Sequence, residues 1–365
     1  MTGGAGFIGS HLVDRFLREG FQVRVLDSLD SKVHPYGLPS YLPKNIEFLR
    51  GDVTDREALF HALQGVDIVS HQAAYQDYML EFSRFFQVNA VGTALLFELI
   101  VQHRMPIKKI IVASSQAVYG EGQYYCDLHH EFLPLPRSID QLRTGGWEVR
   151  CPMCGQEAKP QQLREEYSNP CNQYAVSKMS QEKTALGLGW LHGIPTVALR
   201  YSITQGPRQS LFNQYSGICR IFISRALQRQ PLVIYEDGRQ TRDFVHVDDV
   251  VDANMLVLED ERANFQAFNV GGGKAVSVLQ YAEAVRERAS RDLQWQLTGE
   301  YRRGDNRHSV SSIDKLTRLG WKPQRDLCTI LNDFLNWVEE VGGVPCLLSD
   351  AYRDMKNAGV VLTAR

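Results

Sequence analysis

Three glycines at intervals of three residues open the chain, in the run Gly3-Gly4-Ala5-Gly6-Phe7-Ile8-Gly9. Apolar side chains at helical spacing follow at once, and Gly20 is placed to end that predicted helix. Because glycine lacks a Cβ atom, such a loop can turn tightly and let a pyrophosphate reach the backbone, while the helix N-terminus offers free N–H groups. The loop therefore predicts a dinucleotide-binding turn. Its expected contacts are Gly3, Gly6, Phe7, Ile8 and Gly9.

An acidic residue ends each of the next two predicted strands. Strand 21–26 leads to Asp27, 18 residues after Gly9. A carboxylate at this place can hydrogen-bond the adenosine ribose hydroxyls and would repel a 2′-phosphate, which favours NAD over NADP. Strand 46–50 leads to Asp52 and Val53. We expect both at the cofactor, although Asp52 has the alternative role of capping the following helix.

Strands and helices alternate through the first half of the chain, and the strands are nearly all apolar, as expected for parallel strands covered on both faces. We predict a Rossmann-type, doubly wound parallel α/β sheet over residues 1–204, which binds NAD. A smaller C-terminal α/β substrate domain is expected over 205–365. The further predicted strands are 67–71, 109–113, 196–201, 231–235 and 267–270. The predicted helices are 55–64, 84–104, 173–189, 215–228, 249–258, 277–289 and 325–340.

Small and polar residues follow the central strands. Ala73 and Ala74 come after one of them, where small side chains let a cofactor lie against the backbone. Ser114 and Ser115 end the next. From helix 84–104, Asn89 is expected to reach back to these loops. All are candidate cofactor contacts at the carboxyl edge of the sheet.

One expected strand is missing from the start of the chain. A dinucleotide fold has a buried central strand before the glycine loop, yet Met1 stands one residue before Thr2. Without that strand, its neighbours would bury unpaired backbone groups. We therefore expect a start upstream of Met1, or a trimmed chain, which the intact mass of the native protein would test.

The bulk composition excludes several classes of protein. The net charge is −2 over 365 residues with 22% charged side chains, so no polyanion-binding surface is indicated. We find neither a signal peptide nor an apolar run near the ~18 residues of a membrane span. Seven cysteines suit a reducing compartment better than a disulfide scaffold. We expect a cytoplasmic protein that binds neither nucleic acid nor membrane.

Residues 121–168 break the alternation and contain two close pairs of soft metal ligands. Cys126 and His129 form the first pair, and Cys151 and Cys154 the second, within Cys-Pro-Met-Cys-Gly. Two such knuckles suit a tetrahedral zinc ion, which can close a loop with too little apolar content to fold alone. The alternative is a coincidence of cytosolic cysteines. A catalytic metal is not expected, because four protein ligands leave no open position. Reserve ligands are His130 and Cys171.

A tyrosine and a lysine four residues apart begin the helix predicted at 173–189. Tyr174 and Lys178 project from one helical face, and the neighbouring ammonium favours the phenolate. Tyr174 is therefore a candidate general base near neutral pH. Alone, such a pair is usually a solvated helix face. Here Ser115, at the end of a core strand, is placed to hydrogen-bond the same substrate oxygen.

With these motifs in order, the chain resembles the extended short-chain dehydrogenases/reductases of the sugar-nucleotide epimerase/dehydratase type, of which UDP-glucose 4-epimerase is an example. The resemblance covers nearly the whole chain outside 121–168. The residues that carry it are Thr2 to Gly9, Asp27, Gly51-Asp52-Val53, His71-Gln72-Ala73-Ala74, Asn89, Ser114-Ser115, Val118-Tyr119-Gly120, Tyr174-x-x-x-Lys178, Leu199-Arg200-Tyr201, Gly206-Pro207-Arg208, Asp237-Gly238, Thr241-Arg242-Asp243-Phe244, Phe268-Asn269-Val270-Gly271 and Arg302-Arg303-Gly304-Asp305.

The resemblance implies roles for individual residues. Ser115, Tyr174 and Lys178 would form the catalytic triad on a tightly held NAD, with Lys178 also at the nicotinamide ribose. Arg242 and Arg302 would bind the substrate diphosphate, and arginine forks match phosphate oxygens. Tyr201 would join the cofactor contacts. Family analogy also implies a homodimer that pairs helices 84–104 and 173–189.

The resemblance implies a 4-keto sugar intermediate but does not say which reaction follows its formation. Dehydratases of the family carry an Asp-Glu pair where this chain has Gln116 and Ala117, and neither side chain exchanges a proton at neutral pH. We therefore expect epimerisation at C4 of a nucleotide-linked hexose. Alternatives are dehydration, decarboxylation, reduction, or a sensor without turnover. Ile203 stands where the family commonly has Asn, so the sugar or its pose is expected to differ from the UDP-glucose case.

Overall fold

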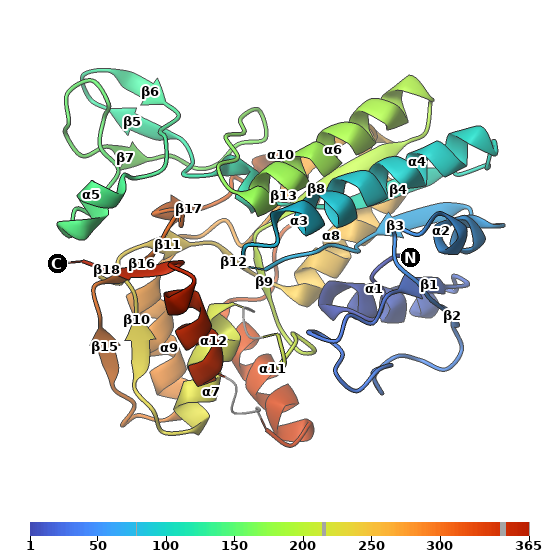
Figure 1. Cartoon of the computed structure of the whole chain (residues 1–365). Helices are drawn as coiled ribbons and strands as arrows, with labels where there is room; N and C mark the ends of the chain where they lie inside the picture. Colours follow the sequence, from blue (N-terminus) through green and yellow to red (C-terminus); the bar gives the residue numbers. More distant parts are fainter. Residues whose placement is uncertain (78, 214–216, 344–347, 365) are drawn as a thin grey trace.

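A parallel sheet carries the first part of the molecule (Figure 1). The structure is a computed structural model that describes residues 1–77, 79–213, 217–343 and 348–364. The sheet has the order β2-β1 and then β3-β4-β8-β13, with Thr2 bridging β1 and β3. The strands are β1 (Arg24–Asp27), β2 (Glu47–Arg50), β3 (Ile68–His71), β4 (Lys109–Ser115), β8 (Thr196–Tyr201) and β13 (Gln266–Val270).

Met1 and Thr2 occupy the central position that a first strand of such a sheet would fill. Thr2 pairs in parallel with both Leu26 and His71. The α-amino group of Met1 donates to the Arg24 carbonyl at 2.6 Å, and burial lowers the pKa of that amino group to about 5. The glycine loop therefore begins between β1 and β3, at the carboxyl edge of the sheet.

Helices cover both faces of this sheet, as the apolar strands predict. Ile111 of β4 packs into the core on one face, and its neighbour Ile110 into the core on the other. On the first face lie α1 (Phe7–Arg18) and α8 (Val247–Glu259), which contact each other. On the second face lie α2 (Arg56–Leu63), α4 (Gly92–Gln102) and α6 (Gln173–Leu191). The doubly wound α/β fold is confirmed.

The chain does not divide once at residue 204, as we expected for domains 1–204 and 205–365. Strand β13 pairs with β8, and α8 packs on α1, so residues 247–270 return to the first sheet. Strand β13 is buried at four of its five positions, so it must be paired inside a sheet. Its partner β8 runs parallel to it, and two parallel strands need a crossover connection, which here contains α8. The second part is therefore discontinuous in sequence.

The second part has its own apolar core beneath the carboxyl edge of the sheet. Its helices and strands are β9 (Ile203–Gln205), α7 (Ile218–Leu227), β10 (Leu232–Ile234), β11 (Thr241–Arg242), β12 (Phe244–His246), β14 (Val276–Ser277), α9 (Val278–Ala289), β15 (Trp295–Leu297), β16 (Glu300–Arg302), β17 (His308–Ser309), α11 (Leu327–Glu340), α12 (Leu348–Asn357) and β18 (Val361–Thr363). The short segments η3 (Glu261–Ala263) and α10 (Asp314–Thr317) pack instead on the first sheet, where Ala263 and Leu316 belong to the core. Of helix 215–228, the first two predicted residues lie outside the described part of the chain. Helix α12 and strand β18 have no counterpart in our predictions, and β18 pairs antiparallel with β16.

The helix predicted at 84–104 is a continuous run in three pieces. It comprises α3 (Phe82–Phe85), a π-helical segment η1 (Phe86–Val91) and α4. By length and composition alone this run is long and apolar enough to cross a membrane, which our sequence analysis did not anticipate. However, 44% of its 18-residue apolar window is buried inside the protein, and the run packs against α6. The apolar side chains on one side of this run therefore belong to the protein core.

The insertion at 121–168 folds as a small separate layer, at the upper left of Figure 1. A 3₁₀ turn, η2 (Gln116–Tyr119), leads from β4 into it. Its antiparallel strands have the order β6-β5-β7, and its core consists of Tyr124, Val149 and Ala158 with Phe132 against them. The elements are β5 (Tyr124–Cys126), β6 (His130–Phe132), α5 (Ile139–Arg143) and β7 (Lys159–Pro160).

Candidate active site

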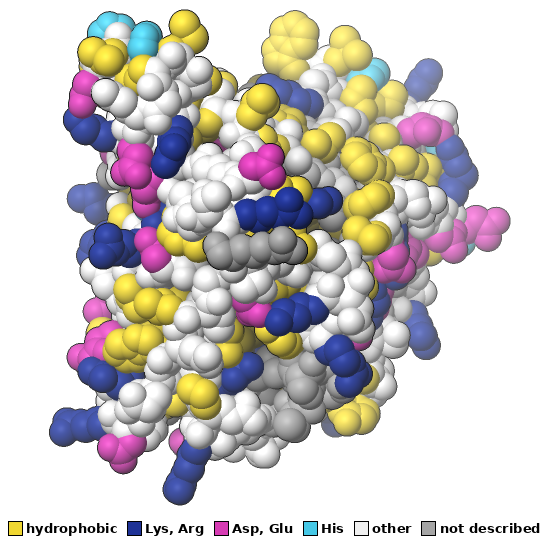
Figure 2. Space-filling model, turned by 60° about the vertical axis from the view of Figure 1, so that its left-hand side comes forward, with side chains coloured by type: hydrophobic (Ala, Val, Ile, Leu, Met, Phe, Trp, Pro, Cys, Tyr) yellow, Lys and Arg dark blue, Asp and Glu magenta, His cyan; other side chains and the backbone are white. Residues whose placement is uncertain are grey.

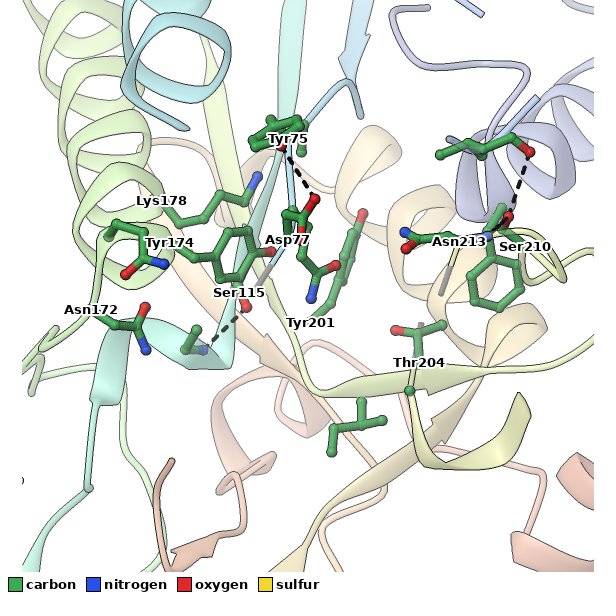
Figure 3. A pocket seen from close by; sticks show the side chains of 18 of the residues that line it. Tyr75, Asp77, Ser115, Asn172, Tyr174, Lys178, Tyr201, Thr204, Ser210 and Asn213 are labelled. Atoms are coloured by element: carbon green, nitrogen blue, oxygen red, sulfur yellow. Dashed lines mark hydrogen bonds between the residues drawn. The ribbon is translucent and has the colours of Figure 1, made fainter. Parts of the chain in front are cut away.

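A cavity of about 1040 Å³ lies between the carboxyl edge of the parallel sheet and the second part of the chain. Figure 3 shows part of its lining from close by. Most of the candidate cofactor and substrate residues predicted from the sequence line this cavity. Those at the proposed cofactor end are Gly3, Gly6, Phe7, Ile8, Gly9, Asp27, Asp52, Val53, Ala73, Ala74, Ser114, Tyr174, Lys178 and Tyr201. Those at the proposed substrate end are Ser115, Gln116, Ile203, Arg242 and Arg302.

The glycine loop forms a cradle that only glycine permits. Gly3 has a φ of +68°, and a Cβ there would lie 2.7 Å from the Ala73 nitrogen. A Cβ on Gly9 would collide with the Gly3 carbonyl. The N-cap of α1 is Gly6, which gives no side-chain cap to the first N–H groups of the helix. These groups face the cavity, so the loop fits the diphosphate of a dinucleotide.

The two acidic residues expected at the cofactor lie at the cavity and are fixed by backbone contacts. Asp27 accepts hydrogen bonds from the backbone N–H groups of Ala5 and Leu29, both at 2.9 Å. Asp52 accepts from the backbone and the hydroxyl of Thr54, at 2.9 and 2.8 Å. The cap of α2 is Asp55 rather than Asp52, which settles the alternative that the sequence left open.

Tyr174, Lys178 and Ser115 meet at the centre of the cavity. Figure 3 shows the Tyr174 ring between the Lys178 and Ser115 side chains. The N-cap residue Asn172 accepts from the Ala175 N–H at 2.8 Å and so fixes the first turn of α6. The Ser115 hydroxyl accepts from the Ala117 N–H at 3.1 Å. Strand β4 and helix α6 thus bring together residues about 60 positions apart.

The ammonium group of Lys178 is held below the cavity surface. It donates to the Ala113 carbonyl and to the Gln181 side chain, both at 2.6 Å. Burial lowers the pKa of Lys178 to about 7, although the Glu182 carboxylate opposes this shift. Its protonation is therefore sensitive to what fills the cavity.

A chain of buried polar side chains supports this lysine from behind, and the sequence analysis did not identify it. Gln181 donates to the Thr93 hydroxyl at 3.0 Å, and Thr93 also lies 3.0 Å from Nε2 of His71. The other ring nitrogen of His71 lies 2.8 Å from the Thr2 hydroxyl. Burial lowers the pKa of His71 to about 3, so this histidine is neutral and structural.

Asn89 is fully buried and does not line the cavity, in contrast to its expected direct contact with the cofactor. Its side chain bonds both the N–H and the carbonyl of Tyr75, at 2.8 and 3.0 Å, and donates to the Ser177 hydroxyl at 2.9 Å. Asn89 therefore reaches back to the strand-end loop, as predicted, but acts through the loop. The π-helical turn η1 gives it this position.

Ser114 and Tyr201 are anchored by buried partners. The Ser114 hydroxyl donates to Glu182 at 2.6 Å, and Glu182 forms a buried ion pair with Arg200 at 2.7 Å. Tyr201 donates to Gln72 at 3.2 Å, and burial raises its pKa to about 12. Tyr201 is thus a neutral hydrogen-bonding group at neutral pH, unsuited to act as a base.

The two candidate diphosphate arginines share a single aspartate. Asp305 lies 3.5 Å from Arg242 and 3.3 Å from Arg302. Arg242 also donates to the carbonyls of Asn306 and Arg307, at 2.9 and 3.0 Å. The loop 305–307 therefore sets the position of Arg242 at the cavity wall.

Sequence reasoning missed several lining residues. Tyr235 ends the predicted strand 231–235, two residues before the Asp237-Gly238 motif, so the sequence placed it near the site. Tyr352 and Met355 come from α12, which is attached at the cavity by the pairing of β18 with β16 and by contacts of Tyr352 and Lys356 with Glu300. Lys32 and Asp77 form an ion pair of 2.9 Å at the cavity, from two loops without any shared motif.

The four predicted metal ligands gather outside the cavity, in the insertion. Their ligand atoms all lie within 4.8 Å of one another. Cys126 Sγ lies 3.7 Å from Cys154 Sγ, and Cys151 Sγ 3.5 Å from His129 Nδ1. Tetrahedral Zn–S bonds of about 2.3 Å place two sulfurs about 3.8 Å apart, so the spacing fits zinc. The reserve ligands lie elsewhere, since His130 faces Tyr125 and Cys171 lines the cavity.

Comparisons with known proteins agree with this geometry. The model of the NAD-dependent epimerase/dehydratase family matches residues 1–138 and 151–271. The dTDP-L-rhamnose 4-epimerase of Burkholderia thailandensis is 32% identical over 348 residues, covering 93% of this chain and 94% of that protein. The UDP-glucose 4-epimerase of Lacticaseibacillus casei is 30% identical over 360 residues, covering 93% and 96%.

Solved structures give the same result. The UDP-glucose 4-epimerase of Thermotoga maritima with UDP-glucose has a TM-score of 0.73 and 26% identity, covering 93% of this chain and 98% of its own. That of Thermus thermophilus in complex with NAD has a TM-score of 0.73 and 29% identity, covering 93% and 97%. With the family match over most of the chain, the cradle of glycines and the Ser115–Tyr174–Lys178 cluster, this protein belongs to the NAD-dependent epimerase/dehydratase family.

Proposed function

We propose that this protein is a nucleotide-sugar 4-epimerase. The observation that carries the proposal is the meeting of Ser115, Tyr174 and Lys178 at one cavity, beside Gln116 and Ala117. A dehydratase needs an acid–base pair at these last two positions, and amide and methyl groups supply none. The Gln116 side chain instead accepts from the Ser311 hydroxyl at 3.5 Å. The 4-epimerases among the relatives support the same reaction.

In this proposal NAD, when bound, accepts the hydride from C4 of the sugar and returns it. The residues to hold it are the glycine loop, Asp27, Asp52 and the small residues after β3. Tyr174 takes the proton of the 4-hydroxyl, and Ser115 hydrogen-bonds the same oxygen, which keeps the developing carbonyl in place. Tyr174 gives the proton back once the sugar has presented its other face. C4 is thereby inverted without net oxidation.

The diphosphate of the substrate is proposed to lie on Arg242 and Arg302. Both side chains line the cavity and are partly exposed, at 13% and 25%. Their guanidinium groups converge on the Asp305 carboxylate, which holds them close together without neutralising both. Ile203, also at the lining, presents an apolar group to the sugar and is proposed to select for a sugar with a less polar edge.

The test is product analysis by NMR after incubation with UDP-, dTDP-, GDP- and CDP-hexoses, dTDP-L-rhamnose and UDP-glucuronate. We expect a C4 epimer from at least one of them. A 4-keto-6-deoxy product would replace epimerisation by dehydration, and a pentose product would replace it by decarboxylation. Bound NAD with no conversion of any sugar would instead support the sensor alternative.

We further propose that the insertion binds one structural zinc ion through Cys126, His129, Cys151 and Cys154. The ligand spacing and the small size of the insertion's own core support this. Purified protein is expected to carry close to one zinc per chain by metal analysis, and Cys151→Ser is expected to lose it. Cys328→Ser, at an exposed cysteine of α11, is the matched control. Full-length protein without stoichiometric metal would refute this site.

The remaining partners are also proposals. Phe82, Phe86 and Val91 expose apolar side chains on one helical run, Leu80 does so just before it, and Trp190 does so at the end of α6. Figure 2 shows hydrophobic side chains gathered over the upper right of the molecule, and elsewhere on that face interspersed basic and acidic groups. We propose a cytoplasmic homodimer built on α3, α4 and α6, with neither nucleic acid nor membrane as partner.

A further inference from the structure

The loop that presents Arg242 to the cavity is clamped from behind by the insertion. Arg137, between β6 and α5, is 8% exposed and donates to the Asp305 carbonyl at 2.9 Å. The same guanidinium makes a bidentate contact with Glu236 at 3.0 and 3.1 Å. Arg137 thus ties the insertion both to the turn after β10 and to the aspartate that Arg242 and Arg302 share.

A second clamp acts on the next residues of the loop. Glu148 lies 2.6 Å from Arg307 and 3.1 Å from His308. Glu121 accepts from the Arg307 backbone N–H at 2.5 Å. Arg307 is fully buried and also pairs with Glu236 and Asp237. The carbonyl of Arg307 in turn accepts from Arg242 at 3.0 Å.

Both acidic residues of this clamp lie on segments that run into the metal ligands. Glu148 stands three residues before Cys151, and Glu121 five residues before Cys126. Each segment also contributes a residue to the core of the insertion: Val149, between Glu148 and Cys151, and Tyr124, between Glu121 and Cys126. A metal ion on Cys126 and Cys151 would therefore fix the two segments relative to each other. The family match stops at 138 and resumes at 151, so the segment with Glu148 is outside it.

We propose that the metal-binding insertion positions the diphosphate site: Arg137, Glu148 and Glu121 hold loop 305–308 so that Arg242 and Arg302 meet a nucleoside diphosphate. This inference rests on the proposed nucleotide-sugar function and deepens it. Arg137 and Glu148 are positioning residues, since each acts through the loop. The cofactor cradle lies on other elements, α1, β1 and β3, so NAD binding is independent of this clamp.

The experiment measures binding of UDP and dTDP by calorimetry to full-length protein with its NAD content determined. The variants are Arg137→Gln, Glu148→Gln and the conservative Arg137→Lys, together with wild-type protein depleted of zinc by a chelator. Lys159→Ala is the matched control, because its ion pair with Asp127 is an exposed one within the same insertion.

We expect Kd for the preferred nucleotide to rise about tenfold in Arg137→Gln, Glu148→Gln and the zinc-depleted protein. Arg137→Lys should fall in between, and the Lys159→Ala protein should match wild type. NAD content should stay unchanged, and KM for the sugar substrate should rise with little change in kcat. Wild-type affinity in the Arg137→Gln and zinc-depleted proteins would overturn the inference and leave the epimerase proposal intact. Failure of wild-type protein to bind UDP, dTDP or the GDP and CDP of the wider sugar panel would overturn both.

Discussion

At the scale of single residues, the site depends on the balance between burial and hydrogen bonding. Lys178 is 1% exposed, and its ammonium donates to a carbonyl and to an amide oxygen. Burial likewise keeps the phenol of Tyr201, on β8, neutral. Tyr174, at the open end of α6, is instead directed into the cavity beside Ser115 (Figure 3). Burial therefore separates the proposed base from its structural neighbours.

The Tyr174→Phe substitution removes the hydroxyl that exchanges the proton while keeping the ring. We expect kcat to fall by about 10²- to 10⁴-fold, since general acid–base catalysis contributes that range. NAD content and thermal midpoint should stay near the wild-type values. Tyr36→Phe, at a side chain that is 86% exposed, is the control and should be fully active. Turnover in Tyr174→Phe at the wild-type rate would exclude this residue as the base.

Glu121 provides a pH-dependent element of stability. Burial raises its pKa from 4.5 to about 7. Between these two values the folded protein holds the proton and the unfolded chain does not, so the free energy of unfolding falls as pH rises through this window. At about 1.4 kcal/mol for each pKa unit, the expected loss is about 3 kcal/mol.

The Glu121→Gln variant should lack this component, so its stability should fall less from pH 5 to pH 8 in chemical denaturation. Asp243, whose pKa burial raises to about 6, contributes in the same direction in both proteins and cancels in the comparison. Glu340→Gln, at an exposed position, should behave as wild type. Equal pH dependence in the Glu121→Gln and wild-type proteins would contradict the assignment.

At the scale of elements, local signals fixed most helices and central strands. Helix α6 begins at the predicted residue because Asn172 caps it, and β4 is continuous because its side chains alternate between two cores. In the run α3–η1–α4, local signals did not predict the detailed backbone conformation. Its apolar pattern predicted one regular helix, whereas Asn89 bonds a distant loop and the backbone adopts a π turn to allow this.

The proposed dimer is a prediction about this run of helices. Val91 is 55% exposed and Trp190 is 72% exposed. A charge on an apolar face buried between two copies would be desolvated without a partner, which is strongly unfavourable. Val91→Glu and Trp190→Glu are therefore expected to sediment with the mass of one chain, and wild type with that of two. Leu135→Glu, at an exposed residue of the insertion, is the control. A monomeric wild-type protein would refute the proposal.

At the scale of the whole molecule, the end of the chain completes the cavity. β18 pairs with β16, where Val361 stands opposite Arg302, and Tyr352 of α12 donates to Glu300 at 2.5 Å. Lys356 pairs with the same carboxylate at 2.6 Å. These contacts hold Tyr352 and Met355 against the end of the cavity that contains Tyr235 and the arginines.

A chain that ends at Gly343 should therefore keep NAD but bind nucleoside diphosphates at least tenfold more weakly, because one wall of the cavity is lost. Titration of UDP and dTDP against both proteins measures this. Glu300→Gln in the full chain serves as a milder variant that loosens the attachment without removing it. Unchanged nucleotide affinity after truncation would show that this wall is dispensable.

The sequence by itself determined the cofactor half of this protein. A glycine loop, an acidic strand end and a Tyr-x-x-x-Lys helix are local motifs, and their chemistry follows from residues near one another in the chain. The clustering of Cys126, His129, Cys151 and Cys154 was also predictable from their spacing, and the zinc that we propose there remains a prediction. The family resemblance, which these motifs carried, extended the prediction to Arg242 and Arg302.

Only the tertiary structure decided how the other half is built. The return of β13 to the first sheet, the α12 wall and the clamp of Arg137, Glu148 and Glu121 on loop 305–308 join residues more than 50 positions apart. Such contacts are selected by burial and charge complementarity in the folded state, and no local pattern encodes their partners. The substrate end of the cavity therefore depends on long-range contacts in the folded chain, whereas the cofactor end is formed by short local motifs.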